Sequence, residues 1–376
     1  MTFPPRLDDA AGARRFAPVI VLPPPSSTAC RMFHSRLTRP RVHFGGPDQS
    51  PRHLRDLLEQ RVEAVPAGGA IDWMVYYFRD EPLASALIRA HRRGVAVRVC
   101  IDGDPLHPSV NEGVIRMLSG SGGIDGGLRV VRQRVPGHLH TKLYYFSHPE
   151  PTALVGSFNP SGNEPEDPKI IAKIGDQDRG HNLLVEIEEP ELLHVLTSRV
   201  AAIHSGRRPF SGLLFPSRSR VAAGAFEAIL FPRLGGNPLD HHLSQLGPGA
   251  EVRIAASHFD DRRVARRLAK LADAGAKIEV VTHHTLRRTP EPLVQFLRER
   301  RVRTHRYEHP DGLPMHAKFI VAEDARRRWS AFGSYNLNPT SRWLNQELLV
   351  FSDDAELWRA LDSRWLAIMA EPWCKH

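Results

Sequence analysis

Two short stretches of this 376-residue chain carry the same residue types at nearly the same spacing. Leu139–Pro160 reads LHTKLYYFSHPEPTALVGSFNP, and Met315–Pro339 reads MHAKFIVAEDARRRWSAFGSYNLNP. Each contains His-x-Lys on an apolar segment, followed by Gly-Ser-aromatic-Asn. Lysine is rare, with 7 residues against 44 arginines, so a lysine at the equivalent place in both stretches indicates a function. The motif residues are His140, Lys142, Ser157 and Asn159 in the first stretch and His316, Lys318, Ser334 and Asn336 in the second.

These residue types suit phosphodiester chemistry that needs no metal. Two ammonium groups and two amides can hold the equatorial oxygens of a phosphoryl group. One imidazole can attack phosphorus while the other protonates the leaving oxygen, which gives a two-step reaction through a phosphohistidine. Packing a sheet does not require this pattern twice, so the repetition favours a catalytic interpretation over a structural one.

The elements that would position these residues also occur twice. Ala70–Gly103 reads as a strand, a helix, an Arg-Gly turn and a second strand with alternating valines, and Ala250–His284 repeats that order. Successive residues of a strand face opposite sides, so the histidine and lysine of each His-x-Lys pair are expected on one face of a strand. This internal symmetry predicts two copies of one α/β unit.

The chain is expected to divide into an irregular N-terminal arm at 1–41, a first half at 42–205, a linker at 206–224 and a second half at 225–376. The linker is assigned because this segment is rich in Ser, Gly, Pro and Arg. A C-terminal helix is expected to place an apolar stripe in the core. That stripe consists of Leu357, Trp358, Leu361, Trp365 and Ile368.

The paired His-x-Lys and Gly-Ser-x-Asn motifs resemble the phospholipase D superfamily over both halves of the chain. The resemblance implies an α/β fold of two tandem α-β-α sandwich halves, related by a pseudo-twofold axis, with one shared active site at their interface. It implies that His140 is the nucleophile and His316 the general acid. It assigns phosphate binding to Lys142, Lys318, Asn159 and Asn336, with Ser157 and Ser334 in support.

Four further positions are interpreted through this resemblance. Glu347 matches a downstream glutamate that commonly steadies the opposite histidine. The superfamily usually has an aspartate five residues after each lysine, and those positions are Ser147 and Glu323 here. Glu323 is a charged replacement, whereas Ser147 is not. The first half has Asn182 where the second has Glu347, and His140 is therefore expected to lack a carboxylate partner.

Composition limits the partners and the compartment. The net charge of +9 favours anionic partners, namely phosphate esters, nucleic acid or acidic lipid. Three cysteines far apart form neither a disulfide framework nor a zinc cluster, and no metal or other cofactor is expected. Neither a secretory signal nor an apolar run of about 18 residues is evident. We therefore expect a cytoplasmic protein, with peripheral membrane contact and oligomeric state left open.

Three functions fit these observations. The favoured one is hydrolysis or exchange of a phospholipid headgroup, with FSGLLFP at 210–216 and FEAILFP at 226–232 as candidate lipid-facing loops. A nuclease of the same superfamily is the first alternative, supported by the net charge and by arginine runs such as 326–328 beside the second His-x-Lys strand. A non-catalytic phosphate-binding scaffold is the second alternative, suggested by Ser147 and Asn182.

Overall fold

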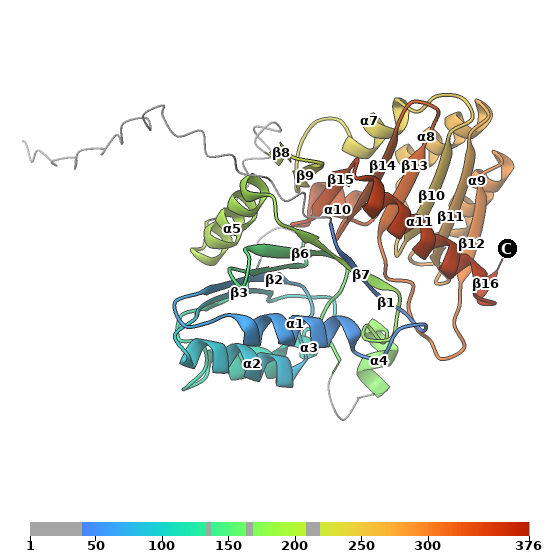
Figure 1. Cartoon of the computed structure of the whole chain (residues 1–376). Helices are drawn as coiled ribbons and strands as arrows, with labels where there is room; N and C mark the ends of the chain where they lie inside the picture. Colours follow the sequence, from blue (N-terminus) through green and yellow to red (C-terminus); the bar gives the residue numbers. More distant parts are fainter. Residues whose placement is uncertain (1–39, 133–136, 163–167, 208–218, 376) are drawn as a thin grey trace, which may run out of the picture. The chain divides into compact units, whose positions relative to one another are not determined.

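The computed structural model describes residues 40–132, 137–162, 168–207 and 219–375. Within these residues, two mixed β-sheets carry helices on both faces (Figure 1). The α/β fold of two tandem α-β-α halves, expected from the sequence, is confirmed.

The first sheet has seven strands in the order β1-β7-β6-β5-β2-β3-β4. β2, β3 and β4 are parallel, and the other neighbours are antiparallel. The strands are β1 (Val42–Gly45), β2 (Ala70–Val75), β3 (Ala96–Asp102), β4 (Leu128–Val131), β5 (Leu143–Phe146), β6 (Thr152–Gly156) and β7 (Asn182–Ile187). The helices are α1 (His53–Ala64), α2 (Glu81–Arg92), α3 (Ser109–Ser119), α4 (Pro168–Ile174) and α5 (Pro190–His204). Helices α1 to α3 cover one face, and α5 covers the other (Figure 1).

The second sheet has nine strands in the order β16-β12-β11-β10-β13-β14-β15-β9-β8. Its strands are β8 (Arg220–Ala223), β9 (Phe226–Leu230), β10 (Glu251–Ala256), β11 (Lys277–His283), β12 (Arg303–Tyr307), β13 (Phe319–Glu323), β14 (Arg328–Gly333), β15 (Leu348–Ser352) and β16 (Cys374–Lys375). Its helices are α7 (Pro238–Ser244), α8 (Arg262–Asp273), α9 (Glu291–Glu299), α10 (Pro339–Trp343) and α11 (Ala355–Ala370). Without the two edge strands β8 and β16, the strand order and directions repeat those of the first sheet.

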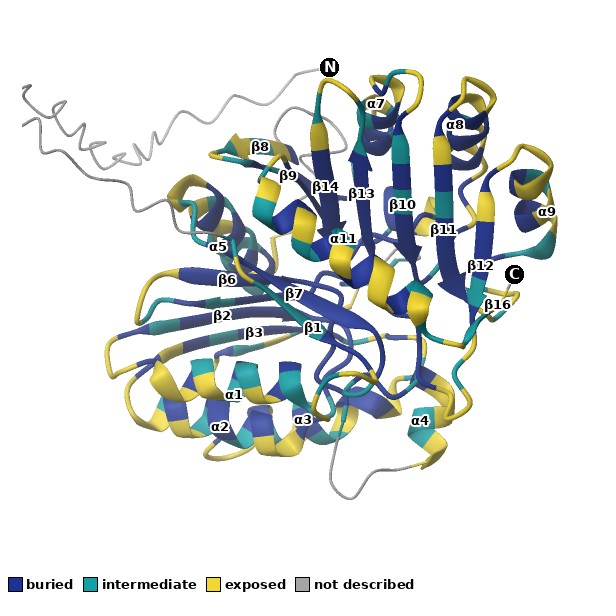
Figure 2. Cartoon of the chain, turned by 45° about the vertical axis from the view of Figure 1, so that its right-hand side comes forward, coloured by how far each residue is buried: buried dark blue, intermediate teal, exposed yellow. Residues whose placement is uncertain are grey.

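The burial pattern follows from the amphipathic sequences of the helices (Figure 2). One apolar core lies between the first sheet and α1 to α3, and another lies between the second sheet and α7 to α9. A third core joins the opposite faces of both sheets with α5 and α11. The C-terminal stripe lies in this third core as expected, with Trp358 and Trp365 7% and 3% exposed. The two halves are therefore held together by a continuous apolar contact.

Three sequence expectations change in the structure. Neither His-x-Lys pair lies in a strand, because β5 begins at Leu143 and β13 begins at Phe319. Residues 220–223, expected in the linker, form β8, and the segment 226–232 contributes β9 to the second sheet and is not a lipid-facing loop. The residues 1–39 of the expected arm and the other candidate loop, 210–216, lie outside the described residues.

Candidate active site

The first His-Lys pair lies on an extended segment that crosses to the other half just before β5. The main-chain N–H of His140 donates to Gln346 O at 3.0 Å, and Gln346 N–H donates to His138 O at 2.8 Å. These bonds form an isolated parallel bridge centred on Leu139. The backbone here pairs with the second half instead of extending the β5 ladder, which is why the expected strand begins later. Lys142 Nζ donates to His140 O at 2.6 Å.

The second pair repeats this arrangement with the roles of the two halves exchanged. His316 N–H donates to His181 O at 3.0 Å, and His181 N–H donates to Pro314 O at 2.9 Å. Lys318 Nζ donates to His316 O at 2.7 Å. Each half therefore holds the histidine segment of the other, and the two pairs meet at one site between the sheets.

The Gly-Ser pairs connect the neighbouring strands beneath the histidines. Ser157 N–H donates to Leu183 O at 3.0 Å, and Ser157 Oγ accepts from Leu183 N–H at 3.1 Å. Ser334 makes the same two bonds to β15, each 3.0 Å long. A Cβ at Gly156 would lie 2.0 Å from Leu183 O, and one at Gly333 would lie 2.2 Å from a β15 carbonyl oxygen. Only glycine permits this approach before each serine.

Glu347 is the carboxylate partner of His140. Its Oε2 lies 2.9 Å from His140 Nδ1 and accepts from Ser334 Oγ at 2.5 Å. Its Oε1 accepts from Ser341 Oγ at 2.7 Å and from Asn345 Nδ2 at 3.1 Å. The expectation that His140 lacks a carboxylate is therefore wrong, because the carboxylate comes from the opposite half.

The residue facing His316 is the neutral Asn182. Asn182 Oδ1 lies 2.8 Å from His316 Nδ1 and accepts from Ser157 Oγ at 3.1 Å. Asn182 Nδ2 donates to Gln177 O at 3.0 Å, which fixes the oxygen of the amide toward the imidazole. Each histidine thus has a hydrogen-bond partner at Nδ1 at nearly the same distance, but the partner of His140 is a carboxylate and that of His316 is a neutral amide.

The motif asparagines lie beside the two pairs. Asn159 is buried, and its Oδ1 accepts from Tyr77 N–H at 3.3 Å, which leaves its NH2 group to donate elsewhere. Asn336 is 6% exposed, and its Oδ1 has no hydrogen-bond partner among the described residues. All of the motif residues therefore gather at one place. Lys142, Ser157 and Ser334 are fully buried, and His316 is 8% exposed.

Burial and mutual repulsion control the charges of the site. Burial lowers the pKa of His140 to about 4 and that of Lys142 to about 7, and the Glu347 charge opposes both shifts. Burial, followed by the charges of Lys318 and Lys142, holds the pKa of His316 well below its ordinary value. Burial acts to raise the pKa of Glu347, but the charge and hydrogen bond of His140 lower it below its usual value. Glu347 is therefore ionised, and both imidazoles are neutral near pH 7.

The neutral imidazoles are held in defined tautomers. Ionised Glu347 can only accept, so Nδ1 of His140 carries the proton and Nε2 carries a free lone pair. Asn182 Oδ1 likewise accepts from Nδ1 of His316. Each histidine can therefore use only Nε2 for chemistry, with two lysines nearby to bind an anion.

Tyr76 and Asp102 complete the first-half side of the site, and Tyr76 was missed in the sequence. The Tyr76 ring centroid lies 4.9 Å from the His140 ring and 5.2 Å from Lys142 Nζ. Asp102 accepts from Leu139 N–H at 2.5 Å. Tyr76 follows β2 and Asp102 ends β3, and the carboxyl ends of parallel strands meet at one sheet edge. That rule, applied to the strand before Tyr76, would have selected this residue.

Ser147 and Glu323 do not reach the site. Glu323 ends β13, about 16 Å of strand from Lys318, and pairs with Arg328 at 2.8 Å. Ser147 Oγ accepts from Ala70 N–H at 2.7 Å, so a hydroxyl can supply the acceptor that ties the end of β5 to β2. Both side chains therefore tie a strand end to a neighbouring strand. At position 147 this needs only a hydrogen-bond acceptor, so a charge is not required.

The arginine run at 326–328 also lies away from the site. It forms the turn between β13 and β14, at the end of the hairpin opposite His316. Arg328 lies over the Trp358 ring at 4.2 Å, and Arg327 donates to Gln245. The run therefore lies at the turn beside this strand, as expected from the sequence, but at the end far from His316.

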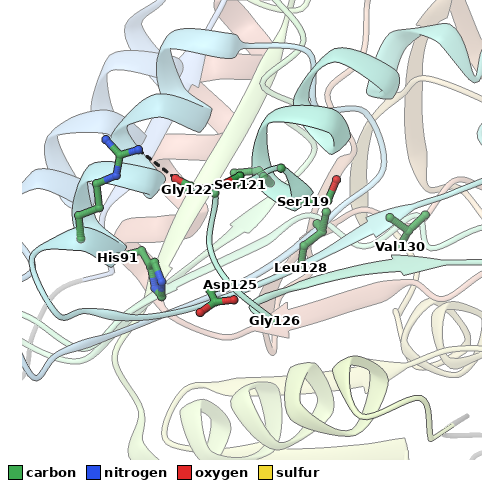
Figure 3. A pocket seen from close by; sticks show the side chains of 12 residues that line it. His91, Ser119, Ser121, Gly122, Asp125, Gly126, Leu128 and Val130 are labelled. Atoms are coloured by element: carbon green, nitrogen blue, oxygen red, sulfur yellow. Dashed lines mark hydrogen bonds between the residues drawn. The ribbon is translucent and has the colours of Figure 1, made fainter.

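A separate hollow of about 780 Å³ lies at the opposite edge of the first sheet (Figure 3). It is lined by the end of α2, the end of α3 and the glycine-rich turn before β4. Arg92 closes one side by donating to Gly122 O at 3.0 Å, drawn as the dashed line in Figure 3. His91 and Asp125 line this hollow, and none of the His-x-Lys or Gly-Ser-x-Asn residues does.

In the part of the chain that the structure describes, no three His, Cys, Asp or Glu side chains are grouped to hold a metal ion. The same residues contain no helix that is long and apolar enough to cross a membrane. The His242 ring stacks on that of Phe351 with 3.8 Å between the ring centroids, and its Nε2 lies 3.3 Å from Glu227 Oε2.

The doubled fold and its paired motifs define a protein of the phospholipase D superfamily. The chain belongs to the family described as "Cardiolipin synthase, PLD-like domain", whose model matches residues 66–167 and 246–368. A search of curated proteins found no match.

Solved structures show the same fold at low sequence identity. Polyphosphate kinase from Porphyromonas gingivalis is 14% identical with a TM-score of 0.61, over 89% of this chain and 51% of that one. This chain thus spans about half the length of that kinase. Phosphatidylserine synthase from Haemophilus influenzae Rd KW20 is 13% identical with a TM-score of 0.60, over 89% of this chain and 87% of that one. The phospholipase D family member Nuc from Salmonella typhimurium is 20% identical over 45% of this chain, with a TM-score of 0.33.

Proposed function

We propose that the protein is a metal-independent phosphodiesterase of the phospholipase D type, which hydrolyses or exchanges the headgroup of a phospholipid. The observation that carries the proposal is the reciprocal hydrogen bonding of His140 to Glu347 and of His316 to Asn182. It supports two imidazoles with Nε2 free, on either side of one phosphate position, with a lysine beside each. The family description and the phosphatidylserine synthase of equal fold support a phospholipid as the substrate.

In the first step, His140 Nε2 attacks phosphorus, and the bond from phosphorus to the leaving oxygen breaks. Glu347 offsets the positive charge that develops on the His140 ring. His316 gives its Nε2 proton to the leaving oxygen and must be cationic at that moment, since its Nδ1 keeps its own proton in the hydrogen bond to Asn182 Oδ1. The bound phosphodiester anion supplies the charge that raises the pKa of His316 for this role.

In the second step, the neutral His316 accepts a proton from water or from an alcohol. The oxygen attacks the phosphohistidine, and His140 leaves with its electron pair. Water yields phosphatidic acid, whereas an alcohol yields a new phosphodiester. Lys142, Lys318, Asn159 and Asn336 hold the nonbridging oxygens in both steps.

The experiment combines the purified full chain, mixed phospholipid vesicles, ethanol and EDTA. We expect phosphatidic acid and phosphatidylethanol as products, both lost in His140→Ala and in His316→Ala. His241→Ala is the matched control, because His241 is exposed on α7. Loss of activity in EDTA, or full activity in either motif variant, would contradict the proposal.

A nuclease is the second candidate, favoured by the net charge of +9. Cleavage of single-stranded DNA in EDTA, with affinity falling steeply as salt rises and no lipid product, would establish it. A non-catalytic scaffold would instead bind phosphate, yield no product from either substrate, and keep its full function in both histidine variants.

A further inference from the structure

The two halves differ in charge on the two sides of the site. Counted from the aspartates that cap α2 and α8, Tyr77 of the first half is equivalent to His258 of the second. Asp102 ends β3, whereas His283 ends the equivalent strand β11. The repeat thus has a tyrosine and a carboxylate on one side and two imidazoles on the other. A substrate with two unlike ends could bind such a site in one direction only.

Arg288 adds a permanent cation to the second-half side. It lies between β11 and α9, where its carbonyl oxygen accepts from Phe259 N–H at 2.9 Å and its N–H donates to Thr285 O at 2.9 Å. Its Nη1 lies 3.5 Å from Ser257 Oγ, which in turn lies 3.2 Å from His258 Nδ1. The backbone therefore holds the guanidinium against the residues that follow β10.

The Arg288 charge acts on the second catalytic pair. After burial and the lysine charges, it is a further cause that lowers the pKa of His316 and of Lys318. After burial, it is also the largest charge effect that lowers the pKa of His258. Ser257, His258 and Lys318 line one small cavity of about 20 Å³. Arg288 is thus within 3.5 Å of Ser257, which lines the same cavity as the catalytic lysine.

No carboxylate among the described residues lies within ion-pair distance of the half-buried Arg288. A guanidinium withdrawn from water is costly to leave without a counter-ion, and its fork of donors fits a carboxylate or phosphate. The second-half side therefore combines a cation of fixed position with free capacity to donate.

We propose that Arg288, with His258, forms a second anion subsite that binds a carboxylate or phosphate carried by the substrate beside its scissile phosphodiester. This deepens the proposed function and rests on it, since it names lipids or acceptors with an additional anionic group as the preferred substrate class. The subsite accounts for the charge difference between two halves whose catalytic motifs are alike.

The test measures ligand binding by calorimetry, which does not require turnover. The full chain in EDTA is titrated with inorganic phosphate and with pyrophosphate, and the experiment is repeated with Arg288→Gln. A second pair of titrations uses phosphoethanolamine and phosphoserine, which differ by one carboxylate. Arg266→Gln is the matched control, because Arg266 is exposed on α8. Arg288→Lys keeps the charge without the fork and remains usable if the glutamine variant does not fold.

We expect wild type and Arg266→Gln to bind pyrophosphate or phosphoserine at least about tenfold more tightly than the matching single-anion ligand. Arg288→Gln should abolish this preference and leave phosphate binding nearly unchanged, with Arg288→Lys intermediate. Equal loss for phosphate and pyrophosphate would overturn the subsite, because Arg288 would then serve the scissile phosphate. An unchanged preference in both variants would also overturn it. A preference that depends on Arg288, in a protein that turns over no phospholipid, would uphold the subsite and refute the proposed function.

Discussion

Replacing Glu347 by glutamine removes a charge from the site while keeping the shape of the side chain. Glu347 accepts from His140 Nδ1, Ser334 Oγ, Ser341 Oγ and Asn345 Nδ2, so all of its neighbours are donors. The amide of glutamine can satisfy His140 with its oxygen, but its NH2 group then faces the NH2 group of Asn345. Glu347→Gln therefore removes the negative charge beside His140 and leaves one buried donor poorly matched.

The size of the effect follows from the geometry. The Oε2 to Nδ1 distance is 2.9 Å, which puts the centres of the carboxylate and imidazolium charges roughly 4 Å apart. At that separation two unit charges attract by about 4 kcal/mol for an effective dielectric constant of 20. The variant lacks this attraction when the His140 ring becomes cationic, so kcat should fall about 100- to 1000-fold. Stability should fall by only about 1–3 kcal/mol, the cost of one poorly matched buried donor.

The assay is initial-rate turnover of vesicle phospholipid, with thermal unfolding measured on the same samples. Glu323→Gln is the matched control, because Glu323 is the glutamate of the β13 hairpin that pairs with Arg328 away from the histidines. We expect the control to keep wild-type kcat. A folded Glu347→Gln protein with kcat within about threefold of wild type would refute the reasoning that this charge supports the covalent step.

Three further predictions concern charge and packing. The pKa of His140 is lowered by burial from 6.5 to about 4, so its contribution to stability is complete above pH 6.5 and is lost as the pH falls to about 4. The unfolding free energy should drop by roughly 3 kcal/mol across that window, and by less in His140→Gln, as measured by urea denaturation; a wild-type stability that is flat with pH would contradict this. Sulfate binding at pH 7 should take up about half a proton or more, because an anion raises the lowered pKa values of His140 and Lys142; calorimetric heats that do not change with the buffer would exclude it. Gly156→Ala should cost at least about 1–3 kcal/mol, because its Cβ would lie 2.0 Å from Leu183 O; unchanged thermal unfolding would show that the strands can separate there.

The fold could be predicted from the sequence because its signals are local and occur twice. The strand-helix-strand units, the C-terminal apolar stripe and the halves show in hydrophobic spacing alone. The starts of β5 and β13 could not be found this way. The residues before them continue the apolar pattern, but their backbone groups bond to Gln346 and His181 of the other half. His140 and Glu347 are 207 residues apart in the sequence, and His316 and Asn182 are 134 residues apart. Contacts between such distant segments leave no local pattern to detect.

The site shows the same division between local and distant information. The motif residues were selected correctly as a group that meets in space, because repetition marks them. The resemblance implied that Glu347 steadies the opposite histidine, and it does contact His140, whereas the alignment of Asn182 with Glu347 wrongly suggested that His140 lacks a carboxylate. Ser147 and Glu323 were selected by their distance from the lysines, but about five residues of strand separate them from the chemistry. Arg288 has no motif, and only folding brings it to Ser257.

The difference between Glu347 and Asn182 gives a physical reason for assigning unlike roles to two identical motifs. A carboxylate beside His140 stabilises the cation that forms when its Nε2 bonds to phosphorus, which favours that ring as the nucleophile. A neutral amide orients His316 equally well but does not stabilise its cation, so protonated His316 is the stronger acid. A stronger acid transfers its proton more readily to a leaving alkoxide. The sequence feature that at first argued against catalysis, the missing glutamate of the first half, therefore supports a division of labour in which His140 carries the phosphate and His316 moves the proton.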